Sequence, residues 1–149
     1  MTHGILDSSD TWILNGKDKS PAFIAVDAGF DVWLPNTRGN KYSNEHVFLD
    51  SRFDKDYWDH SFIEISKYDL PAFMKYVRRF TNMPKNQKIS LITHSQSTTE
   101  TYYGMAKNGE YYEENTDVHI AIAPVAKVTR VAPVNHLFDL LFRNFAPIL

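Results

Sequence analysis

The chain has 149 residues, enough for one hydrophobic core, and its 43% hydrophobic and 14% aromatic content is typical of a globular protein. A formal net charge of −2 gives no reason to expect nucleic acid or an anionic membrane as a partner. Because the chain contains no cysteine, disulfides and thiolate metal sites are excluded, and no segment is long and apolar enough to be expected to span a bilayer.

The first predicted elements are a short helix and a short strand. Ser20 is a typical helix cap, Pro21 suits the first helical turn, and Gly29 is typical of a helix end. Residues 30–34 are β-prone and are followed by Pro35, which favours the end of a strand. A glycine between a helix and a strand is a usual joint of an α/β chain.

A long helical region follows the polar segment at residues 36–53. From Trp58 to Val77, apolar residues recur at three- and four-residue steps, which indicates an amphipathic helix. Pro71 must begin a second helical segment or kink the first one. Residues 82–87 are rich in turn-forming types, so we expect a turn there.

The second half of the chain alternates strand and helix. Residues 88–93 and 118–123 predict strands, and the first lacks polar alternation, as expected for a strand buried on both faces. Residues 98–107 predict a helix that closes near Gly109, and residues 135–145 predict an apolar helix. Helices that alternate with strands favour a parallel sheet with right-handed crossovers, so we expect an α/β fold.

The most informative stretch is the apolar run that ends at Ser95 and leads into a polar helix start. Strand, serine and helix in this order are typical of a G-x-S-x-G nucleophile elbow, where a sharp turn exposes the serine hydroxyl. Thr93 and Ser97 occupy the two glycine positions of that pattern. The alternative is that Ser95, Ser97 and the two threonines that follow only cap the next helix. These residues alone leave both interpretations open.

The remaining polar groups fit structural roles. The six histidines show no ligand spacing such as H-E-x-x-H, so we expect neither a metal site nor another cofactor. Arg38 is expected to form a structural ion pair, with Asp69 or Glu64 as candidate partners. The two tyrosines at residues 111–112 are expected in a surface turn.

Four further segments carry motifs in a common order. Residues 3–12 read H-G-I-L-D-S-S-D-T-W, and residues 27–40 read D-A-G-F-D-V-W-L-P-N-T-R-G-N. Residues 58–72 contain W-D-H-S-F and Y-D-L-P-A, and residues 121–126 read A-I-A-P-V-A. In order and spacing, these segments resemble the acid lipase family, which contains gastric lipase, lysosomal acid lipase and the steryl ester hydrolases of fungi.

The resemblance implies an α/β-hydrolase core at residues 1–126, a mostly parallel sheet with flanking helices, and the beginning of a helical cap at residues 127–149. It also implies a carboxylic ester hydrolase that acts on neutral lipids, triacylglycerols or steryl esters, through a serine acyl-enzyme. Ser95 takes the place of the nucleophile in this resemblance. The backbone N–H groups of Ile5 and Gln96 take the places of the oxyanion-hole donors.

The chain departs from the family pattern at the elbow and in its extent. Thr93 and Ser97 add Cβ atoms where strand and helix pass closely, so we expect a strained turn or a displaced Ser95. In the family, the acid and the base of the triad follow the cap, and we expect neither of them within this chain. A non-catalytic lipase remnant, or a pseudo-enzyme that binds lipid or a partner, is therefore the alternative function.

Other titratable residues near or after the serine do not match a family catalytic position. His94 is adjacent to the serine and is expected to point to the other side of the strand end. The histidines and aspartates that follow are Asp117, His119, His136 and Asp139, and we expect strand-end or surface positions for them.

The cellular location is not determined by the residues at the start of the chain. The first four residues have no charged region and no apolar region, so we expect no signal peptide there. The resemblance implies a secreted or lysosomal protein. We expect interfacial contact with lipid rather than stable membrane insertion, and the apolar side chains at residues 137–145 are candidates for that contact.

Overall fold

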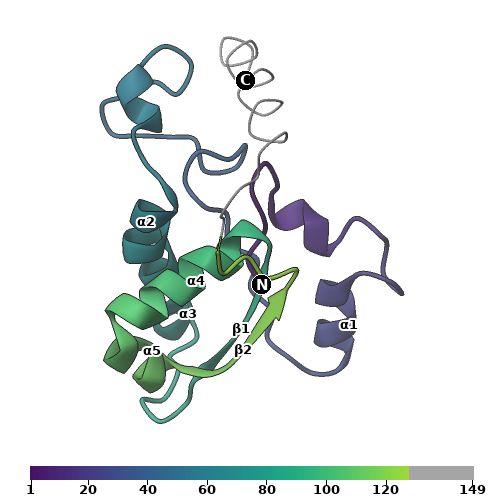
Figure 1. Ribbon diagram of the computed structural model, residues 1–149. Helices are drawn as coiled ribbons and strands as arrows, with labels where there is room; N and C mark the ends of the chain where they lie inside the picture. Colours follow the sequence, from purple (N-terminus) through teal and green to yellow (C-terminus); the bar gives the residue numbers. More distant parts are fainter. Residues whose placement is uncertain (128–149) are drawn as a thin grey trace.

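The computed structural model describes residues 1–127, and Figure 1 shows them as a short sheet with helices around it. The sheet has two parallel strands, β1 (Ile89–His94) and β2 (Thr116–Ile122). Thr2 adds an isolated parallel bridge to Thr93, and Thr2 N donates to Ile92 O at 2.8 Å. Parallel strands connected through helices confirm the predicted α/β class.

Two strand predictions are wrong. Residues 30–34 are not part of a strand, although Trp33 O accepts a hydrogen bond from the Met1 amino group at 2.7 Å. β-propensity alone does not make a strand, because a ladder needs the backbone groups of a neighbour. β1 is not buried on both faces, since Ser90 is exposed and Thr93 is its one fully buried residue. Its apolar run marks a strand, but the burial depends on what packs against it.

The first α-helix, α1 (Pro21–Asp27), begins at the predicted proline. Gly29 follows its end with a φ of 90°, a conformation that glycine adopts without strain. The Ser20 hydroxyl is buried without a hydrogen-bond partner in the described chain and does not cap the helix. The helix is thus confirmed, while the expected cap is wrong.

The predicted amphipathic helix is one helical run in three parts. The parts are α2 (Phe62–Glu64), the π-helical turn η3 (Ile65–Asp69) and α3 (Leu70–Phe80). A capping box starts the run, in which Ser61 Oγ accepts from Ile63 N while Glu64 accepts from Ser61 N at 2.8 Å. The wider turn precedes Pro71, whose ring cannot continue a regular hydrogen-bond ladder. The sequence thus predicted an irregularity at Pro71, and the structure makes it a π turn.

Two helices follow β1 where one was predicted. α4 (Gln96–Lys107) is the predicted helix, and α5 (Gly109–Asn115) comes directly after it. Tyr112 is buried in α5, so the expected surface turn at residues 111–112 is wrong. The Tyr112 ring packs on Gly104, where an added Cβ would lie only 2.7 Å from the ring carbon Cζ. The contact explains how a short polar helix is held against α4.

The other described elements are the 3₁₀ turns η1 (Ser9–Trp12) and η2 (Lys55–Trp58). None of the helices within residues 1–127 combines the length and apolar character that a membrane crossing requires. The helix predicted at residues 135–145 lies outside the described residues, as does most of the expected cap segment.

Candidate functional site

Ser95 occupies the sharp turn between β1 and α4. Its φ of 54° and ψ of −119° lie far from the conformations that a serine adopts without strain. The turn is held by its own backbone, because Ser95 N donates to Ile122 O at 3.0 Å and Ser95 O accepts from Thr98 Oγ1 at 2.6 Å. The geometry favours an elbow over a simple helix cap, and no side-chain cap bond from Ser95 to α4 is found in the described chain.

The segment that contains Ile5 lies against this turn. A Cβ added to Gly4 would be 3.1 Å from Ser95 Cβ and 3.2 Å from His94 Nδ1, closer than ordinary van der Waals contact, so the glycine favours this close approach. His3 anchors the segment: its buried Nε2 accepts from Thr37 N at 3.2 Å. These contacts bring two parts of the sequence, 90 residues apart, to one place.

Two backbone N–H groups remain free beside Ser95. Within the described residues, neither Ile5 N nor Gln96 N donates a hydrogen bond. Gln96 is the first residue of α4, where N–H groups have no partner inside the helix and carry its positive partial charge. Ile5 is 57% exposed, so the segment lies at the surface of the described chain. The arrangement offers two donors next to one hydroxyl.

Thr93 and Ser97 are both fully buried, at 0% exposure. Ser97 Oγ accepts from His94 N at 2.9 Å and lies 3.0 Å from Thr2 O, to which it donates. Thr93 Oγ1 lies 2.7 Å from His119 Nε2. We expected these side chains to crowd the turn, and the structure instead uses their hydroxyls to join neighbouring segments, while the turn at Ser95 keeps its strained conformation.

The first turn of α4 is also joined to the segment that follows β2. Thr99 Oγ1 donates to Val125 O at 2.6 Å, and Val125 N donates to Thr98 Oγ1 at 2.8 Å. Sequence reasoning gave these threonines only a capping role. The signal in the sequence that could have revealed the contact is the presence of two threonines after the serine together with the A-P-V-A segment.

No described histidine or carboxylate hydrogen-bonds to Ser95 Oγ. His119 faces Thr93 and packs edge-on to Tyr102, and burial lowers the pKa of His119. Asp117 accepts from Ser90 Oγ at 2.9 Å, away from the turn. His136 and Asp139 lie outside the described residues. The described chain thus brings together the hydroxyl and the two N–H donors without a general base.

His94 precedes the serine, and its Nδ1 is buried without a hydrogen-bond partner in residues 1–127. No hydrogen bond joins it to Ser95 in that part of the chain, in line with the expectation that neighbouring residues at a strand end point apart.

Behind the turn, Glu100 is a buried carboxyl that sequence reasoning missed. It is 2% exposed, and its Oε1 accepts from Gln96 Nε2 at 3.1 Å. Burial raises the pKa of Glu100 to about 7, the hydrogen bond from Gln96 lowers it, and the nearby Asp69 carboxylate raises it. The signal in the sequence was a glutamine and a glutamate four residues apart on one helix.

Arg38 forms the expected ion pair, and Asp69 is its partner. Arg38 Nη2 and Nε donate to Asp69 Oδ1 at 2.6 and 2.9 Å, and Arg38 N donates to Asp69 Oδ2 at 3.0 Å. The hydrogen bond to Asp69 raises the pKa of Arg38. The pair joins the loop that holds His3 to the π turn η3 beside α4, so its role in the structure is to position segments.

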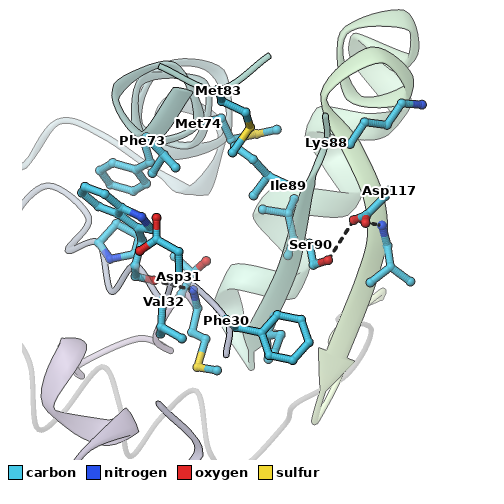
Figure 2. A pocket seen from close by; sticks show the side chains of 18 of the residues that line it. Phe30, Asp31, Val32, Phe73, Met74, Met83, Lys88, Ile89, Ser90 and Asp117 are labelled. Carbon is cyan, nitrogen blue, oxygen red and sulfur yellow. Dashed lines mark hydrogen bonds between the residues drawn. The ribbon is translucent and has the colours of Figure 1, made fainter. Parts of the chain in front are cut away.

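A cavity lies on the described chain away from Ser95. It encloses about 1230 Å³ between α3, β1 and residues 30–35 (Figure 2). Phe73 and Met74 of α3 face Ile89 across it, and none of Ser95, Ile5 and Gln96 is among its lining residues. Its lining is mostly apolar and carries no cluster of catalytic groups. Within residues 1–127, no group of three or more His, Asp or Glu side chains is placed to hold a metal ion.

No protein-family model matches the chain. Among curated proteins, it is similar to gastric triacylglycerol lipase of Bos taurus, with 35% identity over 150 residues, 95% of this chain and 36% of that protein. It is also similar to lysosomal acid lipase/cholesteryl ester hydrolase of Macaca fascicularis, with 34% identity over 97% of this chain and 36% of that protein. Lipase member J of Homo sapiens shares 37% identity over 84% of this chain and 33% of its own length. The chain spans about a third of the length of these relatives.

Proposed function

Because this chain belongs to the acid lipase family, we propose that it carries the nucleophile and the oxyanion hole of a serine ester hydrolase. Ser95 is the proposed nucleophile, and Ile5 N and Gln96 N are the proposed oxyanion donors. Residues 1–126 are assigned to the hydrolase core and residues 127–149 to the start of the cap. The observation that carries the proposal is the φ of 54° at Ser95, between a parallel strand and a helix, with two free N–H groups beside it.

Neutral lipid esters are the proposed substrates. The names of two relatives specify triacylglycerols and cholesteryl esters, both uncharged esters with long apolar chains. We propose contact with a lipid interface, and no cofactor is required for ester hydrolysis by this route.

In the proposed reaction, Ser95 Oγ attacks the ester carbonyl carbon, and the carbonyl oxygen gains a negative charge. Ile5 N–H and Gln96 N–H donate to that oxygen, each contributing on the order of 3 kcal/mol in the transition state. The alcohol leaves, and water then hydrolyses the acyl-serine. A base must take the serine proton, and it comes from outside residues 1–127 in this proposal, since no described side chain hydrogen-bonds to Ser95 Oγ.

The decisive test is labelling of the purified chain with a fluorophosphonate probe. We expect labelling that a Ser95→Ala variant abolishes and a Ser90→Ala variant leaves unchanged, because Ser90 is an exposed serine on the same strand. Such labelling would mean that a base other than the one expected from the family pattern lies within reach of Ser95. A far-ultraviolet circular dichroism spectrum of each variant serves as the folding control.

Folded protein that is not labelled would contradict the proposal. The chain would then be a non-catalytic relative, and the absence of a base next to Ser95 in the described chain would be the reason. Labelling that persists in Ser95→Ala would place the reactive hydroxyl elsewhere.

A further inference from the structure

Glu100 is a buried acid that the proposed reaction does not use. Its Oε1 accepts from Gln96 Nε2, whereas its Oε2 is buried and has no hydrogen-bond partner in the described chain. Its backbone oxygen accepts from Ser66 Oγ at 2.5 Å, which joins α4 to the π turn η3. The residue therefore contacts the first residue of α4 on one side and the neighbouring helical run on the other.

The surroundings of Glu100 disfavour its negative charge. From η3 it is faced by Asp69, and from α5 by Tyr112, whose hydroxyl is also buried without a partner in residues 1–127. The titratable residue of α2 is Glu64, which accepts from Ser61, and that of β1 is His94. Among the described residues, no cation forms an ion pair with Glu100. Arg38 pairs with Asp69 instead. An ionised Glu100 would be a buried charge without compensation.

A simple packing role does not account for these features. An apolar side chain would fill the same space without leaving a carboxyl oxygen unsatisfied, and a buried unsatisfied polar group destabilises a fold. Within residues 1–127, the Glu100 side chain has one hydrogen-bond partner, the side-chain amide of Gln96, which follows Ser95. The contact suggests a role in the geometry of the turn.

We propose that Glu100 is a positioning residue of the Ser95 site: as a neutral acid it stays buried behind the turn and keeps the start of α4 against η3, and its ionisation, which draws Oε2 towards water, displaces Gln96 and the start of α4. This inference rests on the proposed function, in which Gln96 N–H is an oxyanion donor. Once charged, Oε2 must reach water, and α4 has to move away from η3 to admit it. A displacement of about 1 Å at an oxyanion donor is enough to reduce a rate about a hundredfold.

The sign of the pH dependence follows from the direction of the shift. Burial raises the pKa of Glu100 from 4.5 to about 7, so between these values the folded chain keeps a proton that the unfolded chain has lost. The contribution of Glu100 to the free energy of unfolding is therefore fully present below pH 4.5. It decreases as pH rises towards 7 and is lost above that value.

The experiment compares the wild-type chain with Glu100→Gln, a neutral side chain of the same shape. The matched control is Glu45→Gln, which removes an exposed carboxyl. Amide hydrogen exchange and thermal unfolding are measured from pH 5 to pH 8.5. In the wild type, we expect protection in the first two turns of α4 to fall by about tenfold beyond the intrinsic pH effect. Glu100→Gln should show no such fall, and Glu45→Gln should behave as the wild type.

Identical pH profiles for the wild type and Glu100→Gln would overturn the inference. If Glu100→Gln does not fold, a carboxyl NMR titration of the wild type decides instead. Titration of Glu100 near pH 7, accompanied by shifts of the Gln96 side-chain amide, supports the inference. Titration near pH 4.5 overturns it.

The link to Ser95 is tested by the rate of fluorophosphonate labelling. Between pH 7 and 8.5, we expect the labelling rate of the wild type to fall about fivefold or more below its value at pH 6. The labelling rate of Glu100→Gln should stay at its value at pH 6. If Ser95 is not labelled at any pH, the proposed function fails, while the exchange and titration data still decide whether Glu100 controls the start of α4. Equal labelling profiles with different exchange profiles would show that Glu100 stabilises α4 without positioning the site.

Discussion

The turn at Ser95 and the cavity beside α3 are built in opposite ways. Around the turn, the fully buried side chains are small and polar, and Thr93, Ser97 and Thr98 all have 0% exposure and a hydrogen-bond partner. Beside α3, apolar side chains line about 1230 Å³ of space (Figure 2), and Phe30 is 65% exposed. One region is held by directed bonds, the other by apolar surface that the described residues only partly cover.

This contrast separates geometry from stability. A hydrogen bond fixes a distance and a direction between two groups, so a few residues suffice to shape the turn. Hydrophobic stabilisation grows with the area removed from water and needs many neighbours at once. We therefore expect substitutions at the turn to change both reactivity and stability, and substitutions at the cavity edge to change little.

Gly4→Val should have the largest effect, because it places a side chain against Ser95 in the polar region, by which we mean the turn at Ser95 with its buried neighbours Thr93, Ser97 and Thr98. The added Cβ would lie 3.1 Å from Ser95 Cβ, and valine adds two further methyl groups to this close contact. We expect a loss of about 1–3 kcal/mol in the free energy of unfolding, measured by urea denaturation, together with loss of fluorophosphonate labelling. Gly109→Ala is the control, since no atom lies within 4 Å of its Cβ position. Wild-type stability and labelling in Gly4→Val would contradict the close approach.

Ser97→Ala should have the next largest effect. It removes the hydroxyl that joins Thr2 and His94, although His94 N still donates to Thr2 O at 3.1 Å. We expect a loss of about 1 kcal/mol in the free energy of unfolding. Ser90→Ala, at an exposed serine, should stay within about 0.5 kcal/mol of the wild type. Equal effects at both serines would mean that the buried hydroxyl does not stabilise the turn.

Arg38→Lys tests whether the polar region extends to η3. A lysine keeps the charge but loses the paired bonds from Nε and Nη2 to Asp69. Because Arg38 is partly exposed, we expect a loss of under about 1 kcal/mol in the free energy of unfolding. The denaturation midpoint of Arg52→Lys, at a more exposed pair with Asp50, should not change. If the denaturation midpoint of Arg38→Lys is also unchanged, the Arg38–Asp69 pair does not contribute to stability, and the polar region is limited to the turn at Ser95.

Phe30→Ser should have the smallest effect, and it tests the apolar cavity beside α3. Phe30 lines the cavity and is already mostly exposed, so we expect a change within about 0.5 kcal/mol in the free energy of unfolding. Binding of an apolar fluorescent dye to the cavity should weaken, because the substitution removes an aromatic surface. A large loss of stability would show that the cavity is closed in solution.

Local patterns predicted the elements that depend on neighbours along the chain. Pro21 and Gly29 delimited α1, and the apolar run before Ser95 marked β1. Residues 30–34 were assigned to a strand on β-propensity, and they lack the backbone partner that a strand needs. The burial of Tyr112 was missed for a similar reason, since it depends on the space above Gly104 of another helix.

The sequence by itself determined the α/β class and the family, because these follow from the order of helices and strands and from motifs in order. Only the tertiary structure decided that Gly4 meets Ser95, that Ser97 bonds to Thr2, and that the Glu100 carboxyl is buried beside Gln96. The physical reason is range. Turn and helix signals act over a few residues, whereas burial and hydrogen bonding between distant segments exist only once the chain has folded.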